Sequence, residues 1–383
     1  MVAYTFYEGD NRVRRYAETL VNQGWHVDAI ALQYKNTPAF EIIKGVHVYR
    51  VQKRTLNEKR KLSYLVRLLM FFFSSMFFLC KNSFKGKYDV IHVHSVPDFE
   101  IFSAVFQKLF GSKLILDIHD LVPELFSSKF NAKKDSSLFN VLVFAEKLSC
   151  AFANHVIIAN DIWGERLVQR SVPKNKCTVI MNYPDLNIFK NQNGTKDENK
   201  FLLVYPGCLT KHQGIETAIK AVSLLKDKIP TIHFSIYGNG TDENYFKSIV
   251  RELKLEDIVS FHGVISIEKI PEVMTKADIG VEPKLANGFS DEAFSTKILE
   301  FMTLNIPLVV SGTSVHKYYI DNSLVLYHEP GNVDDLAEKI LQLYNNKELR
   351  EQLILNSSRF IKDFTWNEKK EIYLNVIKKI ASL

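Results

Sequence analysis

EAFSTKILEFMTLNIPLVVS, residues 292–311, is the stretch of sequence that decides the fold. Its apolar side chains repeat at near-helical spacing, so residues 295–304 are predicted to form a helix. Pro307 ends the helical pattern, and the apolar run Leu-Val-Val that follows it predicts a buried strand. The order is therefore loop, helix and strand, with Glu292 just before the helix and Glu300 within it.

The start of this helix suits an anion flanked by hydroxyl groups. Ser295 and Thr296 are good N-cap residues, and the amino terminus of a helix presents N–H groups to an anion. Glu300, inside the same helix, can accept hydrogen bonds from ribose hydroxyls beside that anion, and Glu292 can accept them from a second sugar. The pattern therefore suits a nucleotide sugar with its diphosphate at the helix end.

Alternating strands and helices run through both halves of the chain. The predicted strands are 1–6, 26–32, 47–51, 88–94, 113–120, 155–160, 178–182, 201–207, 233–240, 258–263, 277–283, 308–311 and 324–327. Such alternation favours mostly parallel sheets, and 383 residues are too many for one ordinary core. The predicted fold class is therefore α/β, with two doubly wound, Rossmann-like domains.

A polar segment marks the boundary between these domains. Residues 190–200, KNQNGTKDENK, show no apolar periodicity and are predicted to be an interdomain linker. We therefore predict an amino-terminal domain over residues 1–190 and a carboxyl-terminal domain over residues 191–365. Residues 366–383 have an amphipathic helical pattern.

Composition indicates a globular protein of a reducing compartment. Hydrophobic residues make up 46% of the chain and charged residues 24%, as in ordinary globular proteins. The four cysteines stand singly, without C-x-x-C or zinc spacing, which argues against structural disulfides: Cys80, Cys150, Cys177 and Cys208. The first ten residues lack the basic and apolar regions of a signal peptide, so we expect a cytoplasmic protein.

One apolar segment lies in a basic zone of the first half. Residues 51–87 hold nine lysines and arginines and one acid, and inside them residues 62–80 are almost entirely apolar and aromatic. We expect this helix to lie in a membrane interface, at the inner face of the membrane. The expected contacts are Arg67, Phe71, Phe72, Phe77 and Phe78. A buried domain helix and a true membrane span remain as alternatives, and no nucleic-acid-binding motif accompanies the basic residues.

Four motif blocks resemble one enzyme family. The blocks are Y-x-x-D-x-R-V-x-R-x-A-E-x-L at 7–20, LDIHDLVPELFSSKF at 116–130, YPGCLTKHQGIETAIKAV at 205–222 and the E-x7-E segment with Phe294 and its E-F-M-x4-P-L-V-V continuation. Together they resemble retaining glycosyltransferases of family four with the GT-B fold, in particular bacterial surface-polysaccharide enzymes. The resemblance extends over nearly the whole chain.

The resemblance implies a fold, a reaction and substrates. It implies two Rossmann-like domains facing across a cleft, with the last helix crossing back to the first domain. It also implies transfer of a sugar from a nucleotide-sugar donor to a lipid-linked or other surface-glycan acceptor, with retention of anomeric configuration. No D-x-D motif is present, so we expect neither a metal nor another cofactor. A 2-epimerase-like enzyme and a non-catalytic partner subunit remain as alternatives.

The loops that follow the strands and the matching motifs give the candidate site residues. His119 and Glu292 are expected at the transferred sugar as catalytic residues, and Glu300 at the ribose. His94 and Asp120 are expected at the acceptor or beside the catalytic residues. The other expected donor-binding residues are Gly9, Lys211, Gly238, Val264, Phe294, Ser295 and Lys297.

The chain departs from the family pattern at the diphosphate. Cys208 and Gln213 stand where many members have an arginine and a lysine. A diphosphate leaving group needs positive charge, because its negative charge grows as the glycosidic bond breaks. Lys211 and Lys297 are therefore the expected substitutes for those cations.

Overall fold

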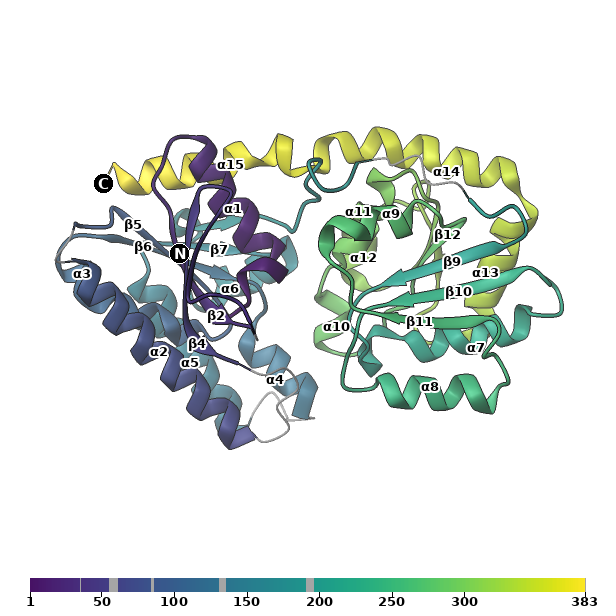
Figure 1. Cartoon of the computed structure of the whole chain (residues 1–383), viewed down its shortest axis with the longest axis horizontal. Coiled ribbons are helices and arrows are strands. Elements are labelled where there is room, and N and C mark those ends of the chain that lie inside the picture. The colour runs from purple at the N-terminus through teal and green to yellow at the C-terminus, as the bar shows by residue number, and fades with distance from the viewer. Residues whose placement is uncertain (35, 55–60, 84–85, 131–135, 191–195, 383) are drawn as a thin grey trace. The chain divides into compact units, whose positions relative to one another are not determined.

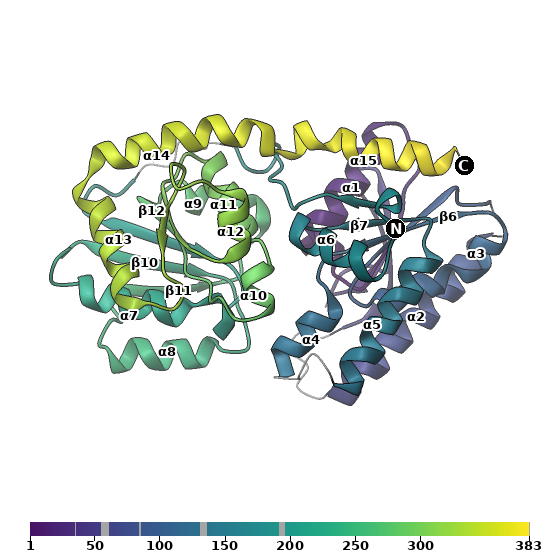
Figure 2. The same ribbon diagram turned by 180° about the vertical axis from the view of Figure 1, so that it is seen from behind.

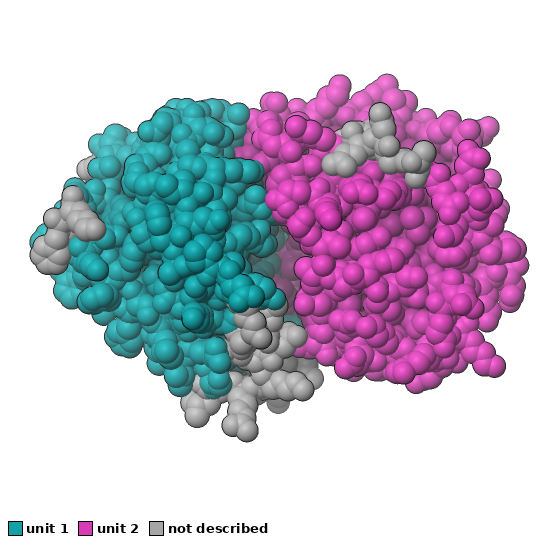
Figure 3. Space-filling model, viewed as in Figure 1, with its two compact units in different colours: residues 1–182, 370–383 teal, residues 183–369 magenta. Residues whose placement is uncertain are grey.

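The computed structural model describes residues 1–34, 36–54, 61–83, 86–130, 136–190 and 196–382. The chain divides into two compact units, shown in two colours in Figure 3. Unit 1 comprises residues 1–182 together with 370–383, and unit 2 comprises residues 183–369. The division at 182/183 falls before the predicted boundary at 190, and residues 191–195 of the predicted linker lie outside the described residues.

Unit 1 contains an eight-stranded sheet with the order β3-β4-β2-β1-β5-β6-β7-β8. Figure 1 labels five of these strands, β2, β4, β5, β6 and β7. The strands are β1 (Val2–Ala3), β2 (Asp28–Gln33), β3 (Phe40–Ile43), β4 (Val46–Lys53), β5 (Val90–His94), β6 (Lys113–Ile118), β7 (His155–Ile158) and β8 (Cys177–Val179). All neighbours pair in parallel except β3 with β4. The central strands are buried along almost their whole length, as expected for a parallel sheet covered on both faces.

The helices of unit 1 connect these strands. They are η1 (Tyr7–Gly9), α1 (Asn11–Asn22), α2 (Lys61–Ser83), η2 (Asp98–Ala104), α3 (Val105–Leu109), α4 (Val122–Phe130), α5 (Ser137–Phe152), α6 (Asp161–Arg170) and η3 (Lys174–Lys176), and α15 (Trp366–Ala381) joins them from Lys370 onward. Local sequence starts several of them. Asp10 caps α1 by accepting hydrogen bonds from the backbone N–H groups of Arg12 and Val13, and Asn160 caps α6 in the same way.

Unit 2 contains a six-stranded, fully parallel sheet with the order β11-β10-β9-β12-β13-β14. The strands are β9 (Phe201–Pro206), β10 (Ile232–Tyr237), β11 (Val259–Gly263), β12 (Ile279–Glu282), β13 (Leu308–Ser311) and β14 (Leu326–His328). Each predicted strand of this half overlaps an observed one. The core packs α7 and α13 against this sheet, with buried residues such as Ile219, Phe234 and Ile340.

The helices of unit 2 place the decisive segment beside the sheet. They are η4 (Lys211–Gln213), α7 (Ile215–Leu225), α8 (Glu243–Glu252), η5 (Ile267–Lys269), α9 (Ile270–Met274), α10 (Phe289–Glu292), α11 (Thr296–Thr303), α12 (Ser314–Tyr319), α13 (Val333–Asn345), α14 (Lys347–Phe360) and η6 (Ile361–Phe364). The predicted helix at 295–304 is α11 with Ser295 as its N-cap residue. Its apolar stripe, including Ile298, Leu299 and Met302, is buried.

The sequence pattern missed one strand and overestimated another. β3 forms an antiparallel hairpin with β4 through Lys44 and Gly45, both with positive φ, which is the conformation of a tight two-residue hairpin turn. Its residues are mostly exposed, so they show no buried apolar pattern. The predicted first strand over residues 1–6 is reduced to β1, and the chain turns into η1 at Tyr7.

Both sheets have a topological switch point, where strand order reverses. In unit 1 it lies between β1 and β5, and in unit 2 between β9 and β12. The chain segments that follow the two adjacent strands leave in opposite directions at such a point. A crevice therefore opens outside the carboxyl ends of the two strands. These two places are where ligands are expected, and each holds a cluster of charged side chains.

Candidate active site

In unit 2, a buried ion pair lies at the switch point. Glu282 ends β12, and its carboxylate lies 3.1 Å from the ammonium group of Lys297 in the first turn of α11. The Lys297 ammonium also lies 4.9 Å from the centre of the Tyr205 ring, at the end of β9. Burial alone would raise the pKa of Glu282, but the positive charge of Lys297, with help from Lys284, holds that pKa below its usual value. The pair is therefore charged.

Lys297 therefore lies at the amino end of α11, and its predicted role as a diphosphate-binding cation stays a prediction. Its side chain is 13% exposed, whereas that of Glu282 is fully buried. The Glu282 carboxylate fixes the lysine and keeps it protonated, since it raises the pKa of Lys297 against the opposing effect of burial. Sequence reasoning missed Glu282, although a charged residue at the end of an apolar strand is a usable signal.

Two loops approach each other closely beside this pair. Gly214 has φ of +71°, and a Cβ there would lie 1.8 Å from the carbonyl oxygen of Pro283, so only glycine fits between the loops after β9 and β12. Gly238 has φ of +129°, and a Cβ there would lie 1.9 Å from the carbonyl oxygen of Gly207. Backbone packing thus accounts for Gly238, which was predicted to contact phosphate, and that role remains a prediction.

A second lysine shapes the loop that carries the first glutamate of the motif. Lys284, in the loop after β12, is buried and donates a hydrogen bond of 2.6 Å to the carbonyl oxygen of Ala293. This contact fixes the chain between Glu292, the last residue of α10, and Ser295. Glu292 and Glu300 are both partly exposed. Lys284 was also missed, because its role depends on a loop brought next to it by the fold.

The predicted contact of the Ser295 backbone N–H with a diphosphate is corrected by the structure. This N–H group was expected to face a diphosphate, but it points to Nε2 of His316 at 3.4 Å, and Nδ1 of His316 lies 2.8 Å from the carbonyl oxygen of Ser311. These contacts fit a neutral imidazole with its proton on Nδ1. Burial lowers the pKa of His316 to about 4, in agreement with that form. Phe294 packs edge-on against His316 and Tyr319, so its ring supports this structure.

The remaining predicted donor-binding residues of unit 2 are largely exposed at its surface. Lys211 is exposed, and its ammonium group lies 4.4 Å from the centre of the Tyr245 ring on α8. Cys208 is exposed, and Gln213 accepts a hydrogen bond of 3.4 Å from the Tyr205 hydroxyl. Val264, which follows β11, is 67% exposed. Neither Cys208 nor Gln213 supplies the charge that the family's arginine and lysine would supply.

In unit 1, three side chains converge on the buried carboxylate of Asp117. Asp117, in β6, accepts two hydrogen bonds of 2.7 Å from Arg12 of α1, one to each oxygen. The same Asp117 oxygen, Oδ2, lies 3.1 Å from Nδ1 of His94 and 3.2 Å from Nε2 of His119. Burial alone would raise the pKa of Asp117, but Arg12 and His119 hold that pKa well below its usual value. Asp117 is therefore an anion that orients both histidines.

His119 was predicted as a catalytic residue and His94 as a residue at the acceptor or beside the catalytic residues, and the structure places them side by side. His94 Nδ1 lies 3.1 Å from His119 Nε2. His94 is buried at the end of β5, whereas the His119 side chain, after β6, is 20% exposed. Burial lowers the pKa of His94 to about 4, so it is neutral at pH 7. Arg12 and Asp117, which complete the cluster, were missed, although both lie in the motif blocks at 7–20 and 116–130.

A pocket of about 260 Å³ opens at this cluster. It lies at the carboxyl ends of β1, β5 and β6, which is the switch point of the unit 1 sheet. The lining includes Tyr4, Asp10, Arg54, Tyr64, His94, His119 and Asp120. The Arg54 guanidinium lies 4.8 Å from the centre of the Tyr4 ring and adds a cation to the wall. Gly9, predicted to lie at a phosphate, is not in this lining, and a Cβ there would meet nothing within 4 Å.

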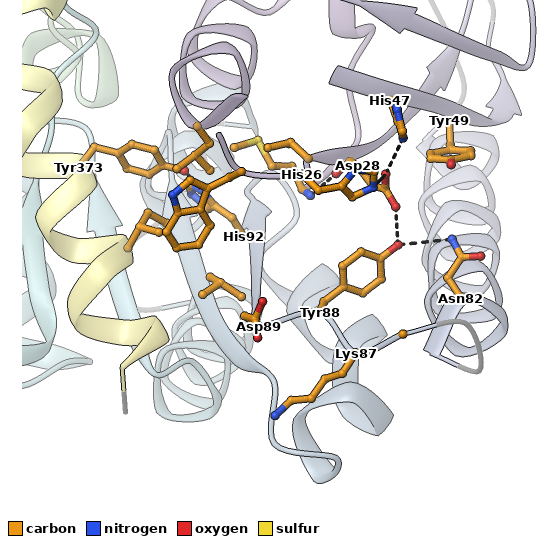
Figure 4. A pocket seen from close by; sticks show the side chains of 17 residues that line it. His26, Asp28, His47, Tyr49, Asn82, Lys87, Tyr88, Asp89, His92 and Tyr373 are labelled. Atoms are coloured by element: carbon orange, nitrogen blue, oxygen red, sulfur yellow. Dashed lines mark hydrogen bonds and ion pairs between the residues drawn. The ribbon is translucent and has the colours of Figure 1, made fainter. Parts of the chain in front are cut away.

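A second pocket of unit 1, of about 510 Å³, lies near the start of β2 (Figure 4). Asp28 accepts a hydrogen bond of 2.6 Å from the Tyr88 hydroxyl on one oxygen. Its other oxygen lies 3.0 Å from Nε2 of His26 and 3.4 Å from Nδ1 of His47. Among the described residues, this group and the group of His92, His94 and Asp117 have the ligand atoms a metal would need. Arg12 already binds both oxygens of Asp117, so a cation is disfavoured there.

The predicted membrane contacts are only partly exposed. Phe77 is 71% exposed, and Arg67, Phe72 and Phe78 are half-buried. The prediction for Phe71 is wrong, because its ring is fully buried and packs edge-on against Tyr4 at 5.2 Å. Among the described helices, one segment, Ser63–Ser83, is long and apolar enough to cross a membrane.

The buried histidines predict acid sensitivity. The pKa of His94 is about 4 when folded and that of a solvent-exposed histidine is about 6.5, so the unfolded chain takes up the proton first. The contribution of neutral His94 to the free energy of unfolding is therefore fully present above about pH 6.5. It falls by about 3 kcal/mol as the pH drops to about 4. Urea unfolding at pH 7.5, 6 and 5 should show this loss, and His94→Gln should show a smaller pH dependence. An equal pH dependence in both proteins would contradict the assignment.

Known families match the two units in turn. The family described as "Glycosyl transferases group 1" matches residues 187–360, and the family described as "Glycosyl transferase 4-like domain" matches residues 9–183. The chain belongs to the group 1 glycosyltransferases. The predicted family resemblance is thereby confirmed, and this membership favours a glycosyltransferase over a 2-epimerase-like enzyme.

Relatives of this glycosyltransferase include enzymes and solved structures. It is 23% identical to alpha-galactosylglucosyldiacylglycerol synthase of Streptococcus pneumoniae over 317 residues, which cover 77% of this chain and 78% of the relative. Sucrose-phosphate synthase from Thermosynechococcus elongatus superposes with a TM-score of 0.78 at 19% identity and covers 99% of each chain. HepE from Anabaena, solved in complex with UDP, superposes with a TM-score of 0.69 at 16% identity, covering 100% of this chain and 99% of that one. The fold of this glycosyltransferase is therefore GT-B, which confirms the predicted fold class.

Proposed function

We propose that this glycosyltransferase moves a sugar from a nucleotide-sugar donor to a lipid-linked or other surface-glycan acceptor, with retention of anomeric configuration. The reaction belongs to capsule, O-antigen or exopolysaccharide synthesis at the cytoplasmic face of the membrane. The relative from Streptococcus pneumoniae is a glycolipid synthase by name, and HepE binds UDP, which supports a lipid acceptor and a nucleotide-containing donor.

The observation that supports this proposal most is the cluster at the switch point of unit 2. The E-x7-E segment folds into α10 and α11 directly beside the charged pair of Lys297 and Glu282. A positive charge held at the amino end of a helix, next to two carboxylates, suits a diphosphate linked to two sugars. In this arrangement Glu300 binds the ribose and Glu292 the transferred sugar.

The chemistry we propose needs no metal. The bond between the anomeric carbon and the diphosphate oxygen breaks, and the acceptor oxygen bonds to the same face of that carbon. The acceptor proton passes to an oxygen of the departing diphosphate, whose growing charge Lys297 stabilises. His119, oriented by Asp117, contacts a sugar hydroxyl. The exposed Lys211 adds charge at the diphosphate, in place of the cations absent at Cys208 and Gln213.

Two substitutions in the motif should separate binding from turnover. Glu300→Ala should weaken nucleotide binding at least tenfold, about 1.4 kcal/mol, because the ribose hydroxyls lose their acceptor. Glu292→Gln should reduce transfer at least tenfold with nucleotide affinity near wild type, because it contacts only the sugar. Thermal-shift titrations with UDP, GDP and dTDP measure binding, since a ligand of the native state raises its melting temperature.

A matched control is Glu338→Ala, which removes a glutamate side chain that is 72% exposed on α13. This variant should retain both binding and transfer. If neither motif variant changes binding or transfer by tenfold, the proposed roles of the two carboxylates are wrong.

A further inference from the structure

Helix α2 is apolar all round, yet only one side of it is buried. Leu68, Phe71, Ser75 and Leu79 repeat every three or four residues and are buried against the rest of unit 1. The opposite side is exposed and equally apolar, and consists of Leu65, Val66, Leu69, Met70, Phe73 and Phe77. A helix that is hydrophobic all round is normally buried on all sides, so this outward side needs a partner.

Two other helices extend the same apolar surface. Helices α2 and α5 both pack on η2, and Figures 1 and 2 show them running side by side. The exposed residues of α5 also repeat every three or four positions: Leu138, Val141, Phe144 and Leu148. Phe106, Leu109 and Phe110, in and after α3, add a further group, since α3 also contacts both α2 and η2. We call the exposed residues of α2, α3 and α5 the three-helix face.

The charges on these helices have one sign at the surface. Within α2, α3 and α5 the one acid is Glu146, which is fully buried and accepts a hydrogen bond of 2.8 Å from Arg170. The basic residues lie outside: Lys81 and Lys147 are exposed, and Arg67 is partly exposed. A broad apolar face with only cationic charges complements an anionic lipid surface. Two copies of this face would oppose like charges.

We infer that the three-helix face docks unit 1 on an anionic lipid bilayer, with α2 and α5 lying along the interface. This inference rests on the proposed lipid-linked acceptor and extends the docking surface well beyond α2. A membrane span by α2 is disfavoured, because it would remove Phe71 from its packing on Tyr4 and break the buried stripe. Large exposed apolar patches of this kind mark interaction sites rather than ordinary surface.

Vesicle co-sedimentation of the full chain tests the inference. Vesicles containing phosphatidylglycerol should bind the protein more tightly than neutral phosphatidylcholine vesicles, and added salt should weaken that binding. Val141→Ser with Phe144→Ser should lower the partition coefficient by about tenfold or more, because both side chains leave water on docking. Both are well exposed, 59% and 61%, so the fold should tolerate the changes.

A matched pair supplies the control. Leu148→Ser on α5 and Leu355→Ser on α14 remove leucines that are each 46% exposed, but Leu355 belongs to unit 2 and lies outside the three-helix face. Leu148→Ser should weaken vesicle binding and Leu355→Ser should not. Equal effects of the two, equal binding to both vesicle types, or no binding would overturn the inference. The inference would also be overturned if light scattering showed that Val141→Ser with Phe144→Ser disrupts a dimer while vesicle binding stays unchanged.

Failure of membrane docking can be distinguished from failure of the proposed function. The α5 variants leave the switch point of unit 2 unchanged, so their UDP, GDP and dTDP titrations should match wild type. Nucleotide binding without vesicle binding would overturn the three-helix face alone. Vesicle binding without binding of any nucleotide would instead contradict the proposed donor.

Discussion

Lys297→Met should abolish sugar transfer and destabilise unit 2 as well. The substitution removes the cation from the start of α11 and leaves the Glu282 carboxylate fully buried without its ion-pair partner. Breaking a buried pair in this way costs about 3–5 kcal/mol of folding stability. Loss of the charge at the leaving diphosphate should lower transfer by at least about a hundredfold. Urea unfolding and a transfer assay measure the two effects.

A second variant separates stability from chemistry. Lys297→Met combined with Glu282→Gln removes both charges, so folding stability should recover by about 2 kcal/mol or more relative to the single variant. Transfer should not recover, because the diphosphate still lacks its cation. If the double variant regains activity, Lys297 serves only to balance Glu282. Lys317→Met on α12, a change at an exposed lysine, is the control and should behave as wild type.

The element pattern could be predicted from the sequence because the strands are buried. The segments predicted at 88–94 and 113–120 match β5 and β6, since strands covered on both faces are continuous apolar runs bounded by polar residues. β3 could not be found in this way, because its side chains face water. The helix at the decisive segment was predictable to one residue at each end, because its apolar stripe and Pro307 define it.

Candidate site residues were predictable where they are close in sequence or where they end a predicted strand, as His94 and His119 do. Glu292, Lys297 and Glu300 lie in one segment, so their grouping follows from the local helix. Arg12 and Asp117 are 105 positions apart, and only the sheet brings them together. Phe71 was wrongly assigned to the membrane because α2 is apolar all round, so its pattern does not show which side is buried.

The Arg12–Asp117 pair predicts a large effect in unit 1. Asp117→Asn should destabilise the protein by about 3–5 kcal/mol, because the Arg12 cation stays buried without its counter-ion and an amide group replaces one acceptor oxygen. Transfer should also fall, because His94 and His119 lose the carboxylate that orients them. Urea unfolding at pH 7.5 measures the first effect, well above the pH at which Asp117 protonates.

His119→Gln distinguishes the catalytic part of this effect from the structural part. The His119 side chain is 20% exposed at the edge of the pocket, so its loss should lower transfer at near wild-type stability. Arg12→Met should destabilise as much as Asp117→Asn, since it leaves the carboxylate buried without its arginine counter-ion. The double variant, Arg12→Met with Asp117→Asn, should then be at least about 2 kcal/mol more stable than the sum of the single effects predicts. If the stability losses of the two single variants simply add in the double variant, the two side chains do not act as one charged pair. A group other than Asp117 would then have to orient His119.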